Sequence, residues 1–319
     1  MTGAVAIGID IGGTRLRTAV VAEDGTVLEQ RRRPTPAGEA DTLLAALEEE
    51  VTAVGGDLPV GIGIAGLVTP DGIVRYGPNI GVRDLSVAAG LEERVGRPVT
   101  VINDASAAAL GEQRVGAGRG CDDLVLFTIG TGVGGGVVLD GRLLVGAGGF
   151  AGELGHLIVE EGGRPCPCGN HGCVEAYAAG SAIGRIATDH LVASDRPSVL
   201  RKLPTIDGPA VTRAAEEGDE IAREVLAEVG TWLGVGIASC VNALDPALVL
   251  IGGGAARAIA PYALPASREA AAARLLGRRF RTPPPIELAV LGDDAGTVGA
   301  ALHATARHPA TGGGQDGSR

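Results

Sequence analysis

Aromatic residues are scarce in this chain, at 2% of its 319 residues. A core must therefore be built from aliphatic side chains, and a hydrophobic fraction of 45% is enough for a substantial one. Lysine is almost absent, since Lys202 is the only lysine among 27 basic residues. The 38 acidic residues leave a formal net charge of -11, which argues against a general nucleic-acid-binding surface.

No segment has the pattern of a membrane span or an export signal. The chain reaches Asp10 without the basic and apolar regions of a signal peptide. The uncharged stretch Leu124–Leu139 is interrupted by five glycines and is too short to cross a bilayer as a helix. We therefore expect a cytoplasmic protein with no membrane partner. The absence of a Gly-x-x-x-x-Gly-Lys-Ser/Thr sequence excludes a P-loop nucleoside triphosphatase.

A pattern of strand, glycine-rich turn and strand occurs twice. In the first copy, the apolar run Val5–Ile9 leads into the turn Asp10–Thr14, and Thr18–Val21 resumes the strand pattern. In the second copy, Leu124–Ile129 leads into Gly130–Gly132. An Asp-Gly turn signal follows each copy. The repetition predicts an internally duplicated α/β fold.

The glycine-rich stretch 116–120 marks the expected boundary between the two copies. We expect a small N-terminal lobe at 1–116, joined by a C-terminal helix at about 295–308, a larger lobe at 117–294 and a disordered tail at 309–319. Apolar spacing and cap residues predict further elements. The expected helices are Asp41–Val54 (capped by Asp41 or Thr42), Ala105–Glu112, Ile221–Leu244, Glu269–Leu276 (capped by Ser267) and Gly296–Ala306, and the expected further strands are Thr26–Leu28, Val60–Ile64, Val99–Ile102, Arg142–Val145 and Ala247–Ile251.

Three glycine-rich turns each follow an apolar strand: Asp10-Ile11-Gly12-Gly13-Thr14, Gly130-Thr131-Gly132 and Gly252-Gly253-Gly254. Glycine lets backbone N–H groups approach a phosphate closely, and a threonine hydroxyl adds a donor. Any one of these turns alone is equally well read as a tight β-turn. Their repetition favours nucleotide binding.

Asn103-Asp104 lies where a buried strand meets an alanine-rich helix. A carboxylate there can accept a proton from a substrate hydroxyl. The alternative is that Asp104 caps the helix, and the two roles are compatible because a helix N-terminus keeps a carboxylate ionised.

One histidine and three cysteines form the pattern His-x9-Cys-x-Cys-x4-Cys, at His156, Cys166, Cys168 and Cys173. One imidazole and three thiolates complete a tetrahedral zinc shell, so we expect a structural zinc site in the loop 156–173. The alternative is a loop of reduced, unligated thiols. Glu153 and Glu175 flank this loop, and both can also be ordinary exposed glutamates. We expect Cys121 and Cys240 to be packing residues.

Together these motifs resemble the ROK family of sugar kinases and repressors, and within it the bacterial ATP-dependent glucokinases. The resemblance covers roughly residues 4 to 306. It rests on Asp10-Ile-Gly-Gly-Thr14, Asn103-Asp104, Gly130-Thr-Gly-Val-Gly-Gly135, Glu153-Leu-Gly-His156 and Cys166-Pro-Cys-Gly-Asn-His-Gly-Cys173-Val-Glu175. It implies an actin-like, hexokinase-like α/β fold with two lobes and a cleft between them.

The resemblance also implies roles for single residues. Asp104 matches the general base that takes the proton of the sugar's 6-hydroxyl, and Asp10 matches an acidic residue that helps to hold Mg²⁺. The positions that match sugar contacts are Gly66, Asn79, Asn103, Asp104, Glu153, His156 and Glu175, and those that match ATP contacts are Gly12, Gly13, Thr14, Thr131, Gly132 and Gly253. Homodimers or homotetramers are the family expectation.

Two positions depart from the family pattern. Arg15 follows the first glycine turn, where it either contacts phosphate or points to solvent. After Asn79 the chain reads Ile80-Gly81-Val82-Arg83, where glucokinases commonly have a Pro-Gly-Trp-like stretch.

We therefore expect an ATP-dependent hexose 6-kinase with glucose as its substrate and structural Zn²⁺. An amino- or acetamido-hexose kinase is the alternative within the same class. A transcription regulator and a non-catalytic sugar sensor are alternatives of another class. Asp10 lies too near the start of this sequence to leave room for a helix-turn-helix domain before it.

Overall fold

The computed structural model describes residues 3–36 and 40–308, and these fall into two compact units. The N-unit comprises the described residues of 1–115, Val145–Phe150 and 294–308, and the C-unit comprises Gly116–Leu144 and Ala151–Asp293. The expected boundaries place Val145–Phe150 in the larger lobe, whereas the structure groups this segment with the N-unit. A Cβ atom added to Gly149 would lie 2.2 Å from the carbonyl oxygen of Val68, which shows how closely the segment packs there. The predicted tail at 309–319 lies outside the described residues.

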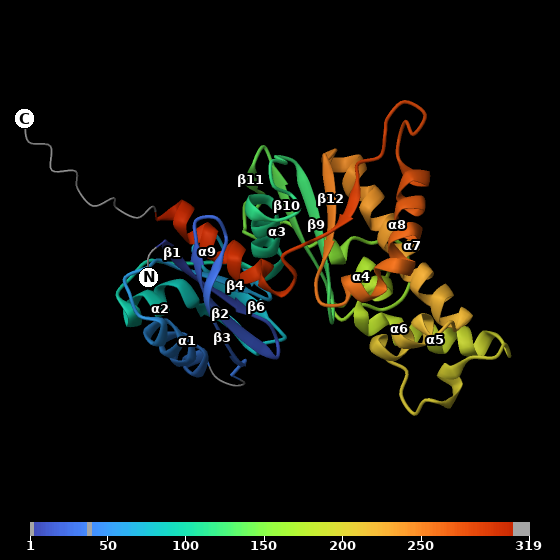
Figure 1. The fold of residues 1–319 in the computed structure, drawn as a ribbon, viewed down its shortest axis with the longest axis horizontal. Coiled ribbons are helices and arrows are strands. Elements are labelled where there is room, and N and C mark those ends of the chain that lie inside the picture. The colour runs from blue at the N-terminus through green and yellow to red at the C-terminus, as the bar shows by residue number, and fades with distance from the viewer. Residues whose placement is uncertain (1–2, 37–39, 309–319) are drawn as a thin grey trace, which may run out of the picture. The chain divides into compact units, whose positions relative to one another are not determined.

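The N-unit is built on a five-stranded sheet in the order β3-β2-β1-β4-β8 (Figure 1). Its strands β1, β2 and β3 are antiparallel neighbours, whereas β4 and β8 run parallel to β1. The parallel register aligns Ile11 with Ile64 and Ile64 with Asn103. The carboxyl ends of these three strands therefore lie side by side. The strand bounds are β1 Ala4–Ile11, β2 Arg15–Ala22, β3 Val27–Pro34, β4 Val60–Ile64 and β8 Val99–Asn103.

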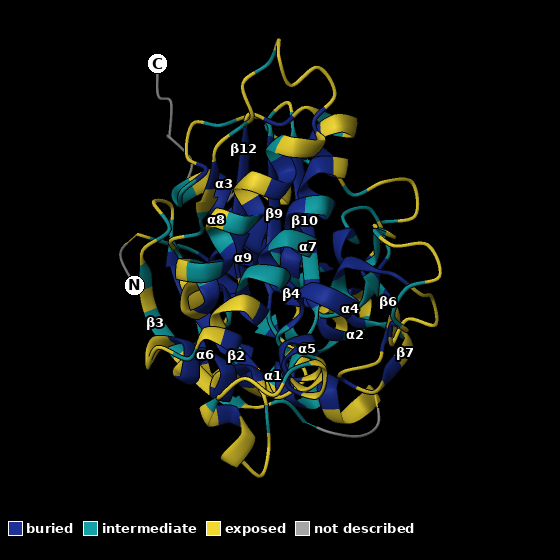
Figure 2. Ribbon diagram, turned by 90° about the vertical axis from the view of Figure 1, so that its right-hand side faces the viewer, coloured by how far each residue is buried: buried dark blue, intermediate teal, exposed yellow. Residues whose placement is uncertain are grey.

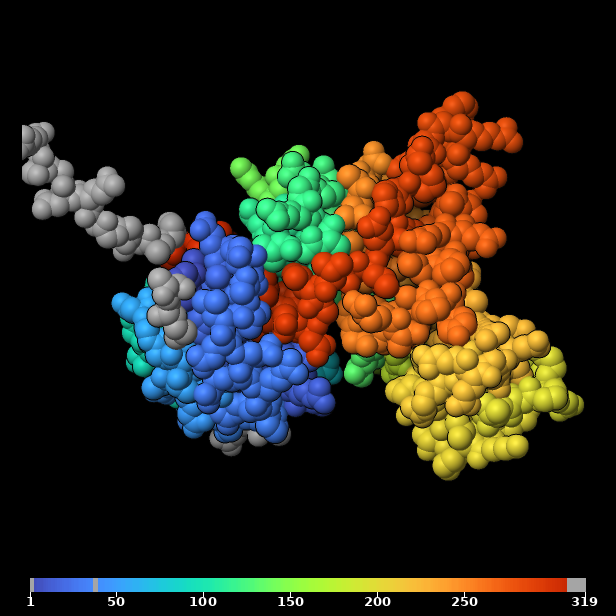
Figure 3. Space-filling view, viewed as in Figure 1, coloured from blue at the N-terminus to red at the C-terminus, as the bar shows by residue number. Residues whose placement is uncertain are grey.

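Helix α9 (Ala295–Arg307) completes the N-unit from the C-terminal end of the described chain. Its backbone lies so close to the sheet that a Cβ atom on Gly8 or Gly61 would come within 1.9 Å of a helix carbonyl oxygen. Figure 3 shows this segment, in red, against the blue N-terminal strands of the same unit. The other helices of the N-unit are α1 Ala40–Val54, α2 Val87–Val95 and α3 Asp104–Val115.

A second, three-stranded antiparallel sheet in the N-unit was not predicted. It consists of β5 (Leu67–Val68), β6 (Ile73–Gly77) and β7 (Val82–Ser86). These strands are short and lack a regular alternation of apolar and polar residues, so the sequence gives only weak signals for them.

The C-unit repeats the plan, with a sheet in the order β11-β10-β9-β12-β13. An antiparallel pair, β9 and β10, again precedes strands that run parallel to the first one. This confirms the predicted duplicated α/β fold. The strand bounds are β9 Leu124–Ile129, β10 Val133–Leu139, β11 Arg142–Leu143, β12 Leu248–Gly252 and β13 Ile286–Leu288.

Helix α7 (Glu220–Leu244) is the longest element of the C-unit. By length and composition it could cross a membrane, but 61% of its most apolar window is buried inside the protein. It belongs to the buried core that Figure 2 shows in dark blue. The other helices of this unit are α4 Val174–Ala178, α5 Gly180–Ala193, α6 Gly208–Glu216 and α8 Ala256–Arg274, and the 3₁₀ turns are Leu154–His156, Val199–Lys202 and Gly292–Asp294, the last of which leads into the N-unit.

Two predicted helix starts were wrong. Helix α8 begins at Ala256, thirteen residues before the predicted start at Glu269, and it contains Pro261 and Pro265. Ser267, the predicted cap, lies inside this helix, fully buried, and its hydroxyl donates to the carbonyl oxygens of Gly230 and Ala263. Helix α1 begins at Ala40, so the predicted cap residues Asp41 and Thr42 are its second and third residues.

Candidate active site

In the N-unit, the predicted site residues gather where the parallel strands end. Asp10 lies near the end of β1, Gly66 follows β4, and Asn103 is the last residue of β8. The Asn103 amide donates from Nδ2 to the carbonyl oxygen of Gly66 at 3.2 Å, which ties two of these strand ends together. The parallel register thus brings residues that are far apart in the sequence to one edge of the sheet.

Asn103 caps helix α3. Its Oδ1 atom accepts a hydrogen bond from the backbone N–H of Ser106 at 3.0 Å, the usual reach of a cap residue to the third helical residue. Asp104 is the first helical residue, and its carboxylate accepts from the N–H of Ala105 at 2.9 Å. Asn103, and not Asp104, is therefore the N-cap residue of α3.

Burial raises the pKa of Asp104 above the ordinary value of 3.8, and the hydrogen bond from Ala105 lowers it only in part. Removal from water disfavours the charged form and makes the carboxylate a better proton acceptor. Its place in the first turn of α3 acts in the opposite direction, because the helix dipole favours negative charge there. Burial dominates, so the pKa is raised and the carboxylate is a stronger base than an ordinary aspartate, as a general base requires.

The first glycine turn packs against another predicted site residue. A Cβ atom added to Gly13 would lie 3.0 Å from the carbonyl oxygen of Asn79, so glycine keeps the turn and Asn79 in contact. Asp10 lies close to the start of α9, since a Cβ on Gly296 would be 2.9 Å from its carboxyl carbon. An ion pair joins Asp10 to Arg17 at 3.6 Å. Arg15 is exposed beside this turn.

The segment after Asn79, which departs from the family pattern, alternates buried and exposed residues. Ile80 and Val82 are both 5% exposed and belong to the core of the N-unit. The exposed residues here are Gly81 and Arg83, and the Arg83 guanidinium lies 5.6 Å from the ring centre of Tyr76. The side chains of Ile80 and Val82, which replace the family's usual residues here, therefore pack in the core of the N-unit.

In the C-unit, the turn Gly130–Gly132 connects β9 to β10. Gly253 follows the neighbouring strand β12 with a φ of 89°, and a Cβ there would lie 2.5 Å from the carbonyl oxygen of Ile129. Only glycine fits this conformation and this close approach. Two glycine turns thus lie next to each other at the ends of adjacent parallel strands.

The four predicted metal ligands come together in the C-unit. Their ligand atoms all lie within 4.8 Å of one another. The sulfur atoms of Cys168 and Cys173 are 3.7 Å apart, and Cys166 Sγ is 3.8 Å from His156 Nδ1. A tetrahedral zinc with bonds of about 2.3 Å to sulfur requires ligands about 3.8 Å apart, so this donor set fits zinc. Cys121 and Cys240 lie outside the cluster.

The two flanking glutamates contact this cluster. Glu153 Oε2 lies 3.9 Å from His156 Nε2, and Glu175 Oε1 lies 3.5 Å from Cys166 Sγ. Sequence reasoning missed Tyr177, which holds the same loop: its hydroxyl donates to Glu160 and accepts from the N–H of Arg164 at 2.7 Å. In the sequence, only the position of Tyr177 four residues after Cys173 indicates that it lies near the cluster.

The fold and these two groups of residues define a class: an α/β protein of the actin-like, hexokinase-like kind, with glycine turns at its strand ends. The model of the ROK family matches residues 6–307. The chain belongs to the ROK family.

Two curated relatives illustrate the range of this family. The glucokinase of Streptomyces coelicolor is 37% identical over 92% of this chain and 96% of its own length. The N-acetylmannosamine kinase of Escherichia fergusonii is 33% identical over 77% of this chain and 82% of its own.

Solved structures give the same fold. The ROK family glucokinase from Streptomyces griseus, in complex with glucose and AMPPNP, has a TM-score of 0.83 and 37% identity over 95% of this chain and 99% of its own. A ROK family transcriptional regulator, a homologue of the E. coli MLC protein, has a TM-score of 0.85 and 31% identity over 96% of this chain and 78% of its own.

Proposed function

We propose that this protein is an ATP-dependent hexose 6-kinase that converts glucose and ATP into glucose 6-phosphate and ADP. The observation that carries the proposal is the placement of Asp104: a carboxylate of raised pKa, relieved of capping by Asn103. Similarity to glucokinases over nearly the whole chain supports glucose and ATP as the substrates.

In this mechanism the oxygen of the sugar's 6-hydroxyl attacks the γ-phosphorus of ATP, and the bond from phosphorus to the β-γ bridging oxygen breaks. Asp104 accepts the hydroxyl proton, which a base within hydrogen-bond reach makes faster by roughly 10²–10⁴-fold. Gly66, Asn79 and the second N–H of Asn103 are the N-unit groups that we assign to sugar binding. Phosphoryl transfer otherwise depends on positioning and charge neutralisation.

The nucleotide is assigned to the glycine turns. Gly12, Gly13 and Thr14 in the N-unit, and Thr131, Gly132 and Gly253 in the C-unit, would offer backbone N–H groups and hydroxyls to its phosphates. Asp10 would help to hold Mg²⁺, which neutralises phosphate charge when bound. The ion pair with Arg17 keeps the Asp10 carboxylate in place.

The Cys/His cluster is assigned to structural zinc. Four protein ligands leave no open position, so the metal would fix the loop rather than activate water. Glu153, His156 and Glu175 would then face the sugar from this loop. A homo-oligomeric, cytoplasmic protein stays a prediction from the family resemblance.

An amino-sugar kinase is the second candidate, because a curated relative acts on N-acetylmannosamine by its name. A free amine would need an unpaired carboxylate near the altered segment after Asn79. The nearest acidic residue along that segment, Asp84, is already paired with Arg75 at 2.9 Å, and Arg83 beside it is cationic. The segment therefore offers no free carboxylate to a protonated amino sugar, whereas glucose and the neutral N-acetylmannosamine are distinguished by the assay that follows.

The test is an assay of ADP release over glucose, mannose, glucosamine, kanosamine, N-acetylglucosamine and N-acetylmannosamine, compared by kcat/KM. We expect glucose to give the highest value. A higher kcat/KM for an amino or acetamido sugar would show that this sugar, and not glucose, is the preferred substrate. No turnover with any of the six would favour a sugar sensor and contradict the kinase proposal.

A further inference from the structure

Helix α4 connects the Cys/His cluster to the turn assigned to ATP. It begins directly after the metal ligand Cys173, which is its N-cap residue, and has only five residues, Val174–Ala178. A helix this short has no stability of its own, because a single turn does not repay the cost of nucleation. Its position must be set by the groups that hold its two ends.

At the cluster end, Cys173 pairs with Ile158 in an isolated β-bridge, and the N–H of Val174 donates to the carbonyl oxygen of Leu157 at 2.9 Å. The carboxylate of Glu175, one residue further, lies with Oε1 3.5 Å from the sulfur of Cys166. The helix and the cluster are therefore in direct contact at its first turn.

Three hydrogen bonds, one from Glu175 in the first turn of α4 and two from residues just past its end, reach the turn Gly130–Gly132 and the residue after it. Glu175 Oε2 accepts from the N–H of Val133 at 2.9 Å. The N–H of Gly180, just past the helix, donates to the carbonyl oxygen of Gly130 at 2.8 Å. The hydroxyl of Ser181 donates to the carbonyl oxygen of Thr131, also at 2.8 Å.

Glu175 packs so closely against this turn that no side chain fits at Gly132. A Cβ atom on Gly132 would lie 2.3 Å from Glu175 Oε2. One carboxylate thus touches a metal ligand with one oxygen and the nucleotide turn with the other. All of these residues lie within the C-unit.

We propose that α4 couples the Cys/His cluster to the nucleotide turn, with Glu175 as the positioning residue, so that an ordered cluster preorganises the protein for nucleotide binding. The identity of the ligand as ATP rests on the proposed function. Preorganisation raises affinity because the turn does not have to be ordered when the ligand binds. Glu175 acts on the nucleotide through Val133 and the turn, in addition to any contact with the sugar.

The experiment measures the Kd of AMPPNP by calorimetry with no sugar present, for the whole protein and for Glu175→Ala, Glu175→Gln and His171→Ala. Alanine removes a hydrogen bond from a charged acceptor, so we expect a loss of affinity of about tenfold. Glutamine keeps an oxygen that can accept from Val133, so we expect a smaller loss. His171 is exposed in the same loop and is not among the clustered ligands, so its variant should bind as the parent does.

Zinc content and circular dichroism accompany each variant, and Ser181→Ala serves as a second probe that leaves the cluster intact. We expect Ser181→Ala also to weaken AMPPNP binding. Unchanged AMPPNP affinity in Glu175→Ala would overturn the coupling, as would a parent protein that does not bind AMPPNP. Because sugar is absent, the coupling can hold even if no hexose is phosphorylated, and it can fail in an active kinase.

Discussion

Asn103 and Ser106 form the hydrogen bond that caps helix α3, with Oδ1 of Asn103 3.0 Å from the backbone nitrogen of Ser106. The amide nitrogen of Asn103 simultaneously donates to Gly66. One side chain therefore fixes the start of the helix that carries Asp104 and the loop that we assign to sugar binding.

Replacing Asn103 by alanine removes the cap and the contact with Gly66. We expect a loss of about 1 kcal/mol in the free energy of unfolding, measured by urea titration, together with weaker sugar binding. Asn103→Ser is the matched variant, since serine caps helices but cannot reach Gly66. It should recover stability without recovering sugar affinity; recovery of both would show that the Gly66 contact is unimportant.

Asp104 predicts a specific dependence of activity on pH. Its pKa is raised above 3.8 by burial, so the base is protonated and inactive at pH values where an ordinary aspartate is already ionised. The acidic limb of the kcat/KM profile should therefore lie above that of an ordinary carboxylate. A profile with its acidic limb at or below 3.8 would assign the limb to another group.

The same shift predicts how stability depends on pH. A carboxyl group with a raised folded pKa contributes stability that is complete below its unfolded value of 3.8 and is lost as pH rises through its folded pKa. The neutral variant Asp104→Asn should accordingly have a higher Tm than the parent at pH 7, with the difference shrinking on acidification. An equal or lower Tm at pH 7 would contradict the burial of charge at this position.

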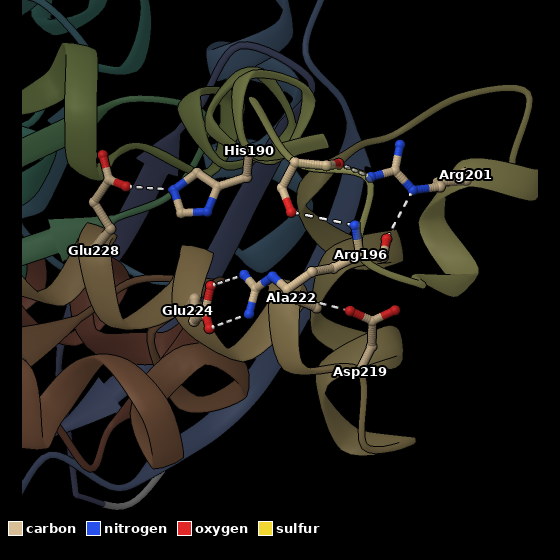
Figure 4. A network of polar contacts seen from close by, with 8 residues as sticks. His190, Arg196, Arg201, Asp219, Ala222, Glu224 and Glu228 are labelled. Carbon is tan, nitrogen blue, oxygen red and sulfur yellow. Dashed lines mark hydrogen bonds and ion pairs between the residues drawn. The ribbon is translucent and has the colours of Figure 1, made fainter. Parts of the chain in front are cut away.

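The polar network around Asp219 lies outside the candidate active site, so we expect substitutions there to change stability without changing activity. In Figure 4, the carboxylate of Asp219 accepts from the N–H of Ala222 at the start of α7, at 3.0 Å. The same carboxylate also accepts from the N–H of Val199 at 2.7 Å. Burial would raise the pKa of Asp219, but its hydrogen bonds outweigh burial and lower it. Its contribution to stability is thus present above pH 3.8 and is lost as pH falls through the folded pKa.

Asp219→Ala should therefore lower the free energy of unfolding at pH 7 by about 1–2 kcal/mol and leave kcat/KM for glucose unchanged. His190→Ala is a companion variant in the same network, where the imidazole lies 2.7 Å from Glu228. Urea titration at pH 7 and near pH 3 separates the contribution of the Asp219 charge from that of the side chain itself. A loss of the same size at both values would show that the Asp219 charge is not involved.

The metal cluster predicts one zinc per chain by elemental analysis of protein purified without chelator. Cys168→Ser should lower zinc content and Tm together, because a hydroxyl is a poor replacement for a thiolate ligand. Cys121→Ser is the control, since Cys121 lies outside the cluster and should leave the metal in place. Absence of zinc from the parent protein would overturn the assignment.

Local signals in the sequence were enough to predict the main strands and the grouping of the metal ligands. Strand β1 and helix α7 follow regular apolar patterns, and the histidine and cysteines are diagnostic by residue type and spacing. The predicted start of α8 was wrong because Ser267 resembles a local cap signal, whereas the helix begins at Ala256 and packs along α7. Short strands such as β6 depend on partners that no local pattern reveals.

The contacts within the site were harder to predict for the same reason. Nothing local indicates that Glu175 meets Val133, because the two belong to different elements and are brought together by the fold. Nor does position in the sequence decide between Asn103 and Asp104 as the cap. His303 in α9 is a further case: it is half-buried by the fold, and burial lowers its pKa to about 4.

The most direct test of the account compares the parent protein with Asp104→Asn in the formation of glucose 6-phosphate from glucose and MgATP, alongside glucose binding by calorimetry. We predict that the variant loses roughly 10²–10⁴-fold in kcat while its glucose Kd stays within a few-fold of the parent. Near-normal turnover by the variant, or no glucose phosphorylation by the parent, would contradict the assignment of this protein as a glucose kinase with Asp104 as its base.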